Sequence, residues 1–279
     1  MALMMPMGTL SVLDMHCHTK EGSMDGLASV FDIVRKMKRM GYTGLVVSDH
    51  NSYKGYETWE EGKSRYPDIS DFNVFKAIEY DSRDGGHIQI ILPDGVEMPP
   101  LLVRGMKVKK VLEEVHKLGG ICGMVHPFGP GAYAAMHTRS VMMHENIQLQ
   151  YDYVEIYNAH IMPVCNEMAE ILNDKLMKPF TAGTDAHKLK YAATAATAFT
   201  RKITTRNELI AAIRDRTMVY AGKVGSIEHP QLRGVVRIAT NAGYYIWNKT
   251  AAFLYGMRRW KAWKIFNLEE QKENEEDEG

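Results

Sequence analysis

The stretch LDMHCHT, residues 13–19, places two histidines two positions apart in a run that otherwise has the character of a β-strand. Successive side chains of a strand point to opposite faces, so we expect His16 and His18 to share one face and Cys17 to point away. Two neighbouring imidazoles contribute little to packing. We therefore interpret the pair as part of a binding site, provided that the rest of the chain supplies partners.

Strand-like and helix-like segments alternate through most of the chain. The segments with helical periodicity are 26–41, 108–120, 164–176 and 205–217. The strand-like segments are 10–18, 42–51, 72–82, 86–92, 121–127, 151–158, 178–187 and 218–223. This order predicts an α/β fold with a parallel sheet and right-handed crossovers, closed as a barrel.

The character of the sequence changes after residue 224. We predict one domain over 9–224, a helical extension over 225–268 and an acidic, disordered tail over 269–279. The extension mixes aromatic and basic residues at helical spacing. Two interpretations of Tyr244–Leu268 stay open: a helix packed on the barrel wall, or a helix that contacts a membrane surface or a partner protein through Trp247, Trp260 and Trp263.

Composition excludes several classes of protein. The 279 residues carry a formal net charge of zero, so no global field attracts nucleic acid, and we expect no double-stranded nucleic acid as a partner. Three scattered cysteines argue against a disulfide scaffold. Without a recognisable signal peptide or an apolar run long enough to span a membrane, the expectation is a soluble, cytoplasmic protein. The sequence leaves the oligomeric state open.

Side chains that can bind metal recur where the predicted strands end or begin, and one more lies in the first loop. They are His16, His18, Asp25, Asp49, His50, Glu79, His87, His126, Asp185 and His187. Taken singly, a histidine in an apolar strand is more often a packed core residue, and Asp49 could cap a helix. Their shared position favours a site, because the carboxyl ends of strands in α/β sheets are where active sites assemble.

Nitrogen and carboxylate ligands of this kind suit Mn, Fe or Zn, and there are too many for one ion. We therefore expect two or three divalent ions, bridged by a carboxylate. The sequence has no GxSxG elbow, P-loop or GxGxxG turn. The remaining histidines end no convincing strand or lie on a helix surface, and we expect them outside the site: His116, His137, His144, His160 and His229.

The constellation resembles the PHP (polymerase and histidinol phosphatase) superfamily. The motifs that carry the resemblance are DMHCHT with SMDG, GLVVSDHN, AIEYDS with GHI, MVHPF, VEIYNAH and AGTDAH, which span roughly residues 11–222. The resemblance implies a distorted (β/α)7, TIM-like barrel with a trinuclear metal centre. It also implies which residues bind each ion. His16, His18, Glu79 and Asp185 would hold the first ion, Glu79, His87 and His126 the second, and Asp25, His50 and His187 the third. Asp49 would orient a histidine.

The resemblance further implies hydrolysis of a phosphate ester, such as a nucleotide, a short oligonucleotide or a sugar phosphate, by a hydroxide that bridges the ions. Asp25 or His187 could pass a proton to the leaving group. Lys20, Arg83, Arg104 and Arg139 are candidate phosphate clamps. Two alternatives stay open: a metal-dependent hydrolase of a non-phosphate bond, and a non-catalytic metal-binding domain that serves a partner.

Overall fold

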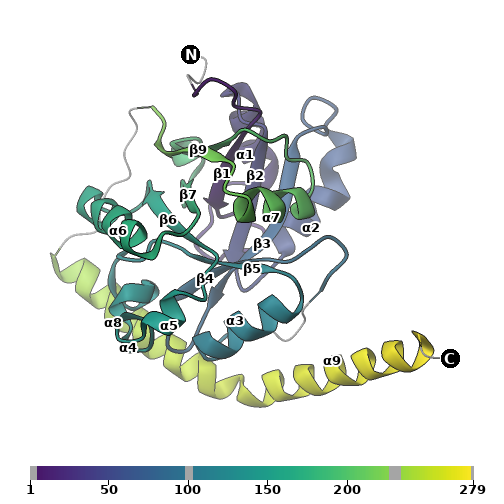
Figure 1. Ribbon diagram of the computed structural model, residues 1–279, viewed down its shortest axis with the longest axis vertical. Coiled ribbons are helices and arrows are strands. Elements are labelled where there is room, and N and C mark those ends of the chain that lie inside the picture. The colour runs from purple at the N-terminus through teal and green to yellow at the C-terminus, as the bar shows by residue number, and fades with distance from the viewer. Residues whose placement is uncertain (1–4, 98–102, 226–233, 278–279) are drawn as a thin grey trace.

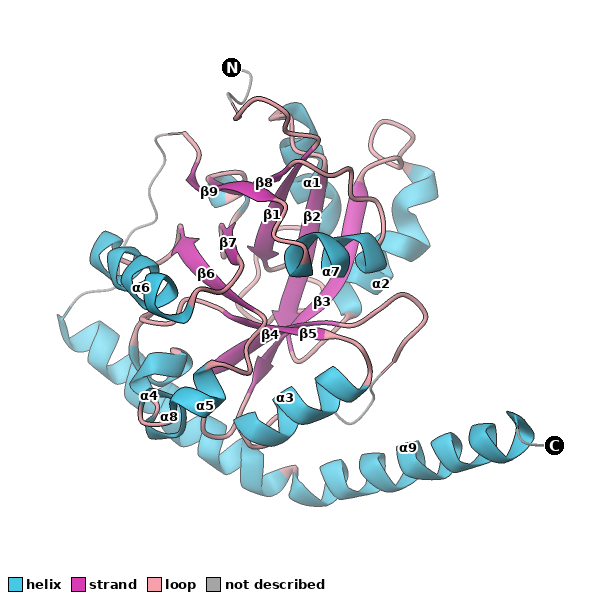
Figure 2. Ribbon diagram, viewed as in Figure 1, coloured by secondary structure: helices cyan, strands magenta, loops and turns pink. Residues whose placement is uncertain are grey.

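The computed structural model describes residues 5–97, 103–225 and 234–277, and within these ranges it describes the side chains of all residues except 234–237 and 268–277. Nine strands form one sheet in the order β7-β6-β5-β4-β3-β2-β1-β8-β9 (Figures 1 and 2). Their bounds are β1 (Ser11–Cys17), β2 (Gly44–His50), β3 (Asn73–Asp81), β4 (His87–Ile91), β5 (Ile121–Met124), β6 (Tyr153–Asn158), β7 (Phe180–Gly183), β8 (Ala195–Phe199) and β9 (Met218–Lys223).

The sheet curves until the segment after β7 meets β1, which makes a nearly closed barrel. The Asp185 backbone N–H donates to the His16 carbonyl at 2.7 Å, and the Thr184 hydroxyl donates to the Asp14 carboxylate at 2.5 Å. Cys17 and Ala186 form an isolated parallel bridge. The predicted α/β barrel with helices at its carboxyl terminus is therefore confirmed.

The expectation of a parallel sheet was wrong for part of the barrel. Strand β4 runs antiparallel to both β3 and β5, and β8 runs antiparallel to both β1 and β9. Residues 82–86 join β3 to β4, and so short a connection allows only an antiparallel hairpin. Strand β8 was not predicted, because its sequence, AATAF, is mostly alanine, which has little preference for strands.

Helices cover the outside of the barrel and one of its ends. Their bounds are α1 (Val30–Arg39), α2 (Lys54–Gly62), α3 (Val108–Lys117), α4 (Arg139–Met142), α5 (Glu145–Gln148), α6 (Pro163–Leu176) and α7 (Arg206–Arg214), with short 3₁₀ helices η1 (Lys63–Arg65), η3 (Gly131–Tyr133), η4 (Ala135–His137) and η5 (Leu189–Tyr191). Helix α7 begins at a capping box in which Thr205 and Glu208 satisfy each other's backbone N–H groups. Its apolar face packs against Leu13 and Met15 in a fully buried core cluster.

Two long helices follow the barrel, α8 (Gly234–Leu254) and α9 (Gly256–Asp277). Helix α8 packs on the barrel: Ala251 and Ala252 are buried, and the buried Asn248 side chain donates to the Ser82 carbonyl at 2.8 Å. The first part of helix α9 contacts the barrel, where Trp263 packs against a core cluster, and its carboxyl-terminal part extends away (Figure 1); Trp260 is 58% exposed. The acidic run from residue 269, expected to be disordered, continues α9 as a helix to Asp277. Among the described residues, no helix is both long and apolar enough to cross a membrane.

Candidate metal centre

The side chains predicted to bind metal converge at the edge of the barrel where β1, β2, β3 and β6 end. Strand β4 runs in the opposite direction, so its first residue reaches the same edge, and His87 pairs with Asp81 at the end of β3. His126 and Asp185 lie two residues after the ends of β5 and β7. Strand order and direction therefore bring together residues that are far apart in sequence.

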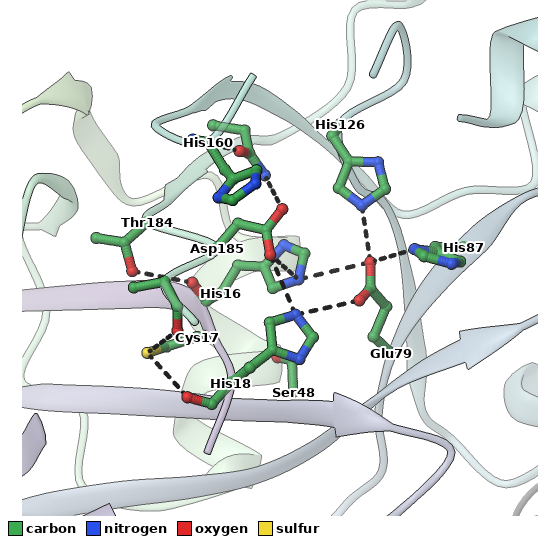
Figure 3. A network of polar contacts seen from close by, with 12 residues as sticks. His16, Cys17, His18, Ser48, Glu79, His87, His126, His160, Thr184 and Asp185 are labelled. Atoms are coloured by element: carbon green, nitrogen blue, oxygen red, sulfur yellow. Dashed lines mark hydrogen bonds and ion pairs between the residues drawn. The ribbon is translucent and has the colours of Figure 1, made fainter. Parts of the chain in front are cut away.

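All nine predicted ligands enter groups in which one ligand atom per residue lies within 4.8 Å of the others. The groups are His18, Asp25, His50 and His187; His16, His18 and Asp185; His16, Glu79 and His126; and His50, Asp81 and His87. Figure 3 shows the Glu79 carboxylate among His16, His18, His87 and His126. Oxygen Oε1 of Glu79 is 2.8 Å from His87 Nδ1 and 2.7 Å from His126 Nε2. Oxygen Oε1 of Glu79 thus contacts histidines from two different ligand groups.

The donor atoms of this centre fit bound cations. The Nε2 atoms of His16 and His18 are buried and make no hydrogen bond. Nevertheless, His18 Nε2 lies 3.2 Å from Glu79 Oε2 and 3.1 Å from Asp185 Oδ1. A buried nitrogen lone pair that faces carboxylate oxygens is unfavourable unless a proton or a metal ion lies between them. The residues present therefore suit two or more divalent ions.

The charges of the centre shift its pKa values strongly. Burial by itself would lower the pKa of His16, but Glu155, Asp185 and Glu79 raise it well above its usual value. Burial would also lower the pKa of His87, but the negative charges of Glu79 and Asp81 raise it to about 9. Burial would raise the pKa of Glu79, but the neighbouring histidines hold it well below its usual value. Without metal these histidines bind protons, so metal ions and protons compete for the same nitrogens.

Glu155, on β6, is a functional candidate that the sequence interpretation missed. Its Oε1 atom lies 3.1 Å from His16 Nδ1, and its Oε2 accepts the His126 backbone N–H at 2.7 Å. The carboxylate therefore holds His16 with Nε2 directed at the centre, as outer partners of metal-binding histidines do. The signal in the sequence was a glutamate within the apolar run YVEIYN, which is buried in the structure.

Asp49 orients a histidine indirectly, through Ser23. The Ser23 hydroxyl donates to Asp49 Oδ1 at 3.0 Å and contacts His18 Nδ1 at 3.0 Å. Asp49 also accepts the backbone N–H of Thr19 at 2.7 Å, which fixes the loop after β1. A Cβ atom at Gly22 or Gly55 would lie within 2.3 Å of Asp49 Oδ2, so only glycine fits at these two positions.

Asp81 was also missed, although its spacing from Glu79 puts both side chains on one face of β3. It is buried, with Oδ1 3.1 Å from His87 Nε2 and 3.5 Å from His50 Nδ1. Its other oxygen pairs with Arg104 at 2.5 Å. The pKa of Asp81 lies well below its usual range because His50 and His87 outweigh the effect of burial. Asp81 thus adds a ligand candidate to the nine predicted ones.

Helix α8 reaches this centre through Tyr244, whose hydroxyl lies 2.8 Å from His87 Nε2. The Tyr244 ring contacts Tyr133, with ring centroids 4.0 Å apart. The carboxyl-terminal extension therefore supports His87, and its aromatic residues do not act only at the outer surface.

The backbone of the centre contains two unusual conformations. His126 and Asp185 have φ angles of 27° and 49°, a region that residues other than glycine rarely adopt. Both follow the end of a strand, and the turn aims their side chains inward. Such conformations cluster at functional sites, where the surrounding structure holds them in place.

A cavity of about 600 Å³ opens beside the metal-binding residues. His137 and His160, expected outside the site, line it, and the His160 ring lies 5.2 Å from that of His187. They were missed because His137 ends the short 3₁₀ helix η4 and His160 lies in the turn after β6, where sequence periodicity gives no direction. His116 and His144 are exposed and line no part of it, and His229 lies outside the described residues.

None of the four predicted phosphate clamps is among the described residues that line the cavity: Lys20, Arg83, Arg104 and Arg139. Lys20, Arg83 and Arg139 are exposed elsewhere. Arg104 is half-buried and held by Asp81 and by the side-chain oxygen of Asn248 at 3.1 Å. Asp25 and His187, the predicted proton donors, do line the cavity, with Asp25 Oδ2 3.1 Å from His187 Nε2.

The family model described as PHP-associated matches residues 164–218. No curated protein matches the sequence. Among solved structures, PsfC from Pseudomonas syringae is similar with a TM-score of 0.58 and 16% identity, over 84% of this chain and 97% of that one. A two-domain protein from Bacteroides vulgatus, which contains a predicted PHP-like metal-dependent phosphoesterase, is similar with a TM-score of 0.55 and 17% identity.

The match to the Bacteroides protein covers 76% of this chain and 65% of that one. Endonuclease Q, solved with a 27-mer duplex substrate that carries an abasic lesion, is similar with a TM-score of 0.55 and 14% identity, over 74% of this chain and 56% of that one. The chain thus spans only part of these two proteins, and at such identities the likeness is one of fold. The chain is therefore similar to PHP proteins in its barrel fold and, over residues 164–218, to the PHP-associated family model.

Proposed function

We propose that the chain is a metal-dependent phosphoesterase that hydrolyses a phosphate ester of a small molecule, a short oligonucleotide included. The observation that carries the proposal is the convergence of imidazole and carboxylate ligands on a cavity large enough for a substrate. Clustered divalent ions supply, when bound, an activated water and neutralisation of phosphoryl charge. Several cations at one cavity suit an anionic phosphoryl group better than a neutral amide or lactone.

The groups of ligand atoms support the following assignment of residues. His16, His18, Glu79 and Asp185 would hold one ion, and Glu79 would bridge to a second ion held by His87 and His126. Asp25, His50 and His187 would hold the third. In this assignment Glu155 and Ser23 orient His16 and His18. Asp81 would orient His87 and His50 or replace one of them as a ligand.

Asp25 and His187 are the residues that we propose to deliver a proton to the leaving group. Asp25 lies at the lip of the cavity with a half-exposed carboxylate, next to the His187 imidazole. Burial would lower the pKa of His187, but Asp25 and Asp185 raise it, so that the ring carries a proton more readily than a free imidazole does. His187 Nδ1 faces the Asp185 carbonyl, so Nε2 is the atom that would carry the proton beside Asp25, and it would do so only while it is not bound to the third ion.

The test is a phosphate-release assay on purified protein with Mn²⁺, Fe²⁺ or Zn²⁺, over nucleotides, short oligonucleotides and sugar phosphates. We expect turnover that a chelator abolishes and that falls by several decades in Asp185→Ala. A panel that gives no phosphate above the Asp185→Ala background would overturn the proposal. Turnover of amides or lactones alone would favour a hydrolase of non-phosphate bonds. Full metal content without any turnover would favour a binding domain.

A further inference from the structure

Apart from the predicted metal ligands, the lining of the cavity is largely apolar and aromatic, and its polar members are His137, His160, Thr240 and Asn241. Phe128 and Tyr133 come from the segment after β5, and Ile161 and Met162 from the segment before α6. Helix α8 contributes Ile238 together with the polar Thr240 and Asn241. The cavity thus combines residues that suit metal ions and a phosphoryl group with apolar side chains that suit an apolar group.

Among the described residues that line the cavity there is no lysine or arginine. The guanidinium of Arg104 reaches the centre only through Asp81 and is held there by Asn248. Bound ions would therefore neutralise one phosphoryl group, and a second phosphate further out would lie against a largely apolar lining that offers no lysine or arginine as a counter-charge. Removing such a charge from water without a partner is strongly unfavourable.

The cavity is also larger than a phosphoryl group requires. Its volume of about 600 Å³ falls within the range of sites that hold ligands of drug-like size. Helix α8 keeps its wall in place, because Asn248 donates to the Ser82 carbonyl and Tyr244 contacts His87. The additional volume is therefore a formed subsite at the metal centre.

We infer that this subsite binds the leaving group of the substrate and that this group is an uncharged ring system, such as a nucleoside or an aryl alcohol. The inference rests on the proposed phosphoesterase function and narrows its substrate class. A ring stacked against Phe128 and Tyr133 gains apolar burial and aromatic contact. A sugar without a base gains much less from apolar burial, and a second phosphate would lose its hydration without gaining a counter-charge.

The experiment compares ligands with the same reacting group on the full-length protein loaded with Mn²⁺. For turnover, uridine 5′-monophosphate, ribose 5-phosphate and uridine 3′,5′-bisphosphate all release phosphate from a primary alcohol. We expect kcat/KM to be at least about tenfold higher for the monophosphate than for either of the others. For binding alone, calorimetry should give a lower Kd for benzylphosphonate than for methylphosphonate.

Two variants on one helix provide a matched test. Ile238 and Ile246 are 66% and 65% exposed on α8, but only Ile238 lines the cavity. We expect Ile238→Ala to lower the preference for benzylphosphonate by about fivefold and Ile246→Ala to leave it unchanged. If sugar phosphate or bisphosphate reacts as well as the monophosphate, or if both variants behave alike, the inference is wrong and the phosphoesterase proposal stands. If no ester releases phosphate, both fail.

Discussion

Replacing Glu155 by glutamine tests whether the buried carboxylate next to His16 orients that histidine for metal binding. In the structure one oxygen of Glu155 faces His16 Nδ1 at 3.1 Å and the other accepts the backbone N–H of His126 at 2.7 Å. If the amide oxygen of a glutamine keeps the bond to His126, its NH₂ group faces His16. His16 Nδ1 must then accept a hydrogen bond, which moves the ring proton to Nε2 and blocks metal binding there.

The opposite orientation of the amide places NH₂ against the N–H of His126, where two donors face each other. Both arrangements disturb the centre, and losing the outer partner of a metal-binding histidine typically costs 10–100-fold in metal affinity or activity. We therefore expect Glu155→Gln to weaken Mn²⁺ binding by about 10–100-fold. The shape of the side chain, and hence the packing of β6, should change little.

The assay is a competition between protein and a metal-buffering chelator, followed by metal quantification. Glu170→Gln, an exposed change on α6, is the matched control and should bind as the wild type does. Thermal unfolding in excess chelator establishes that both variants are folded. Unchanged metal affinity in folded Glu155→Gln would refute the reasoning.

Three further predictions concern the same centre. In Gly183→Ala the new Cβ atom would lie 2.3 Å from the His16 Cβ, so we expect weaker metal binding and a loss of about 1–3 kcal/mol in unfolding free energy. The control is Gly243→Ala on α8, where a new Cβ atom would have nothing within 4 Å and should cause no loss. Equal melting curves for the two variants would contradict this prediction. Tyr244→Phe should weaken metal binding several-fold through His87 without unfolding the barrel, and an unchanged affinity would show that the hydroxyl is dispensable. In the metal-free protein, kept so by a chelator, protonation of His87 stabilises the folded state because its pKa is raised to about 9. This contribution to the free energy of unfolding is complete below about pH 6.5 and is lost as the pH rises through 9. Metal should therefore raise Tm more at pH 9 than at pH 6.5. A difference in Tm between metal-loaded and metal-free protein that becomes smaller as the pH rises would contradict this prediction.

The barrel, and the gathering of the predicted ligands at one edge of it, could be predicted from the sequence because strand ends can be located from the change between apolar and polar residues. His16, His18, Glu79, His126 and Asp185 follow that rule. Glu155 does not follow it, because the sequence alone does not distinguish a buried glutamate inside an apolar strand from an exposed residue at the edge of a sheet. Tyr244 was out of reach, since no local pattern tells which part of the barrel a distant helix will cover.

The antiparallel direction of β4 illustrates the same limit. Local periodicity identifies residues 87–91 as a strand, but the direction depends on the short connection from β3 and on pairing with β5. That direction is what carries His87 to the metal centre. The two positive φ angles, at His126 and Asp185, likewise result from contacts between distant segments and have no signal in the neighbouring residues.

Metal content per chain in the wild type and in Glu79→Gln tests the central claim most directly. Glu79 contacts His87 and His126 through one oxygen and His18 through the other, so that it joins the ligand groups. We predict more than one tightly bound ion per chain in the wild type, and in Glu79→Gln the loss of the bridged ions together with activity, while circular dichroism shows a folded barrel. Full metal content and full turnover in folded Glu79→Gln would contradict the account.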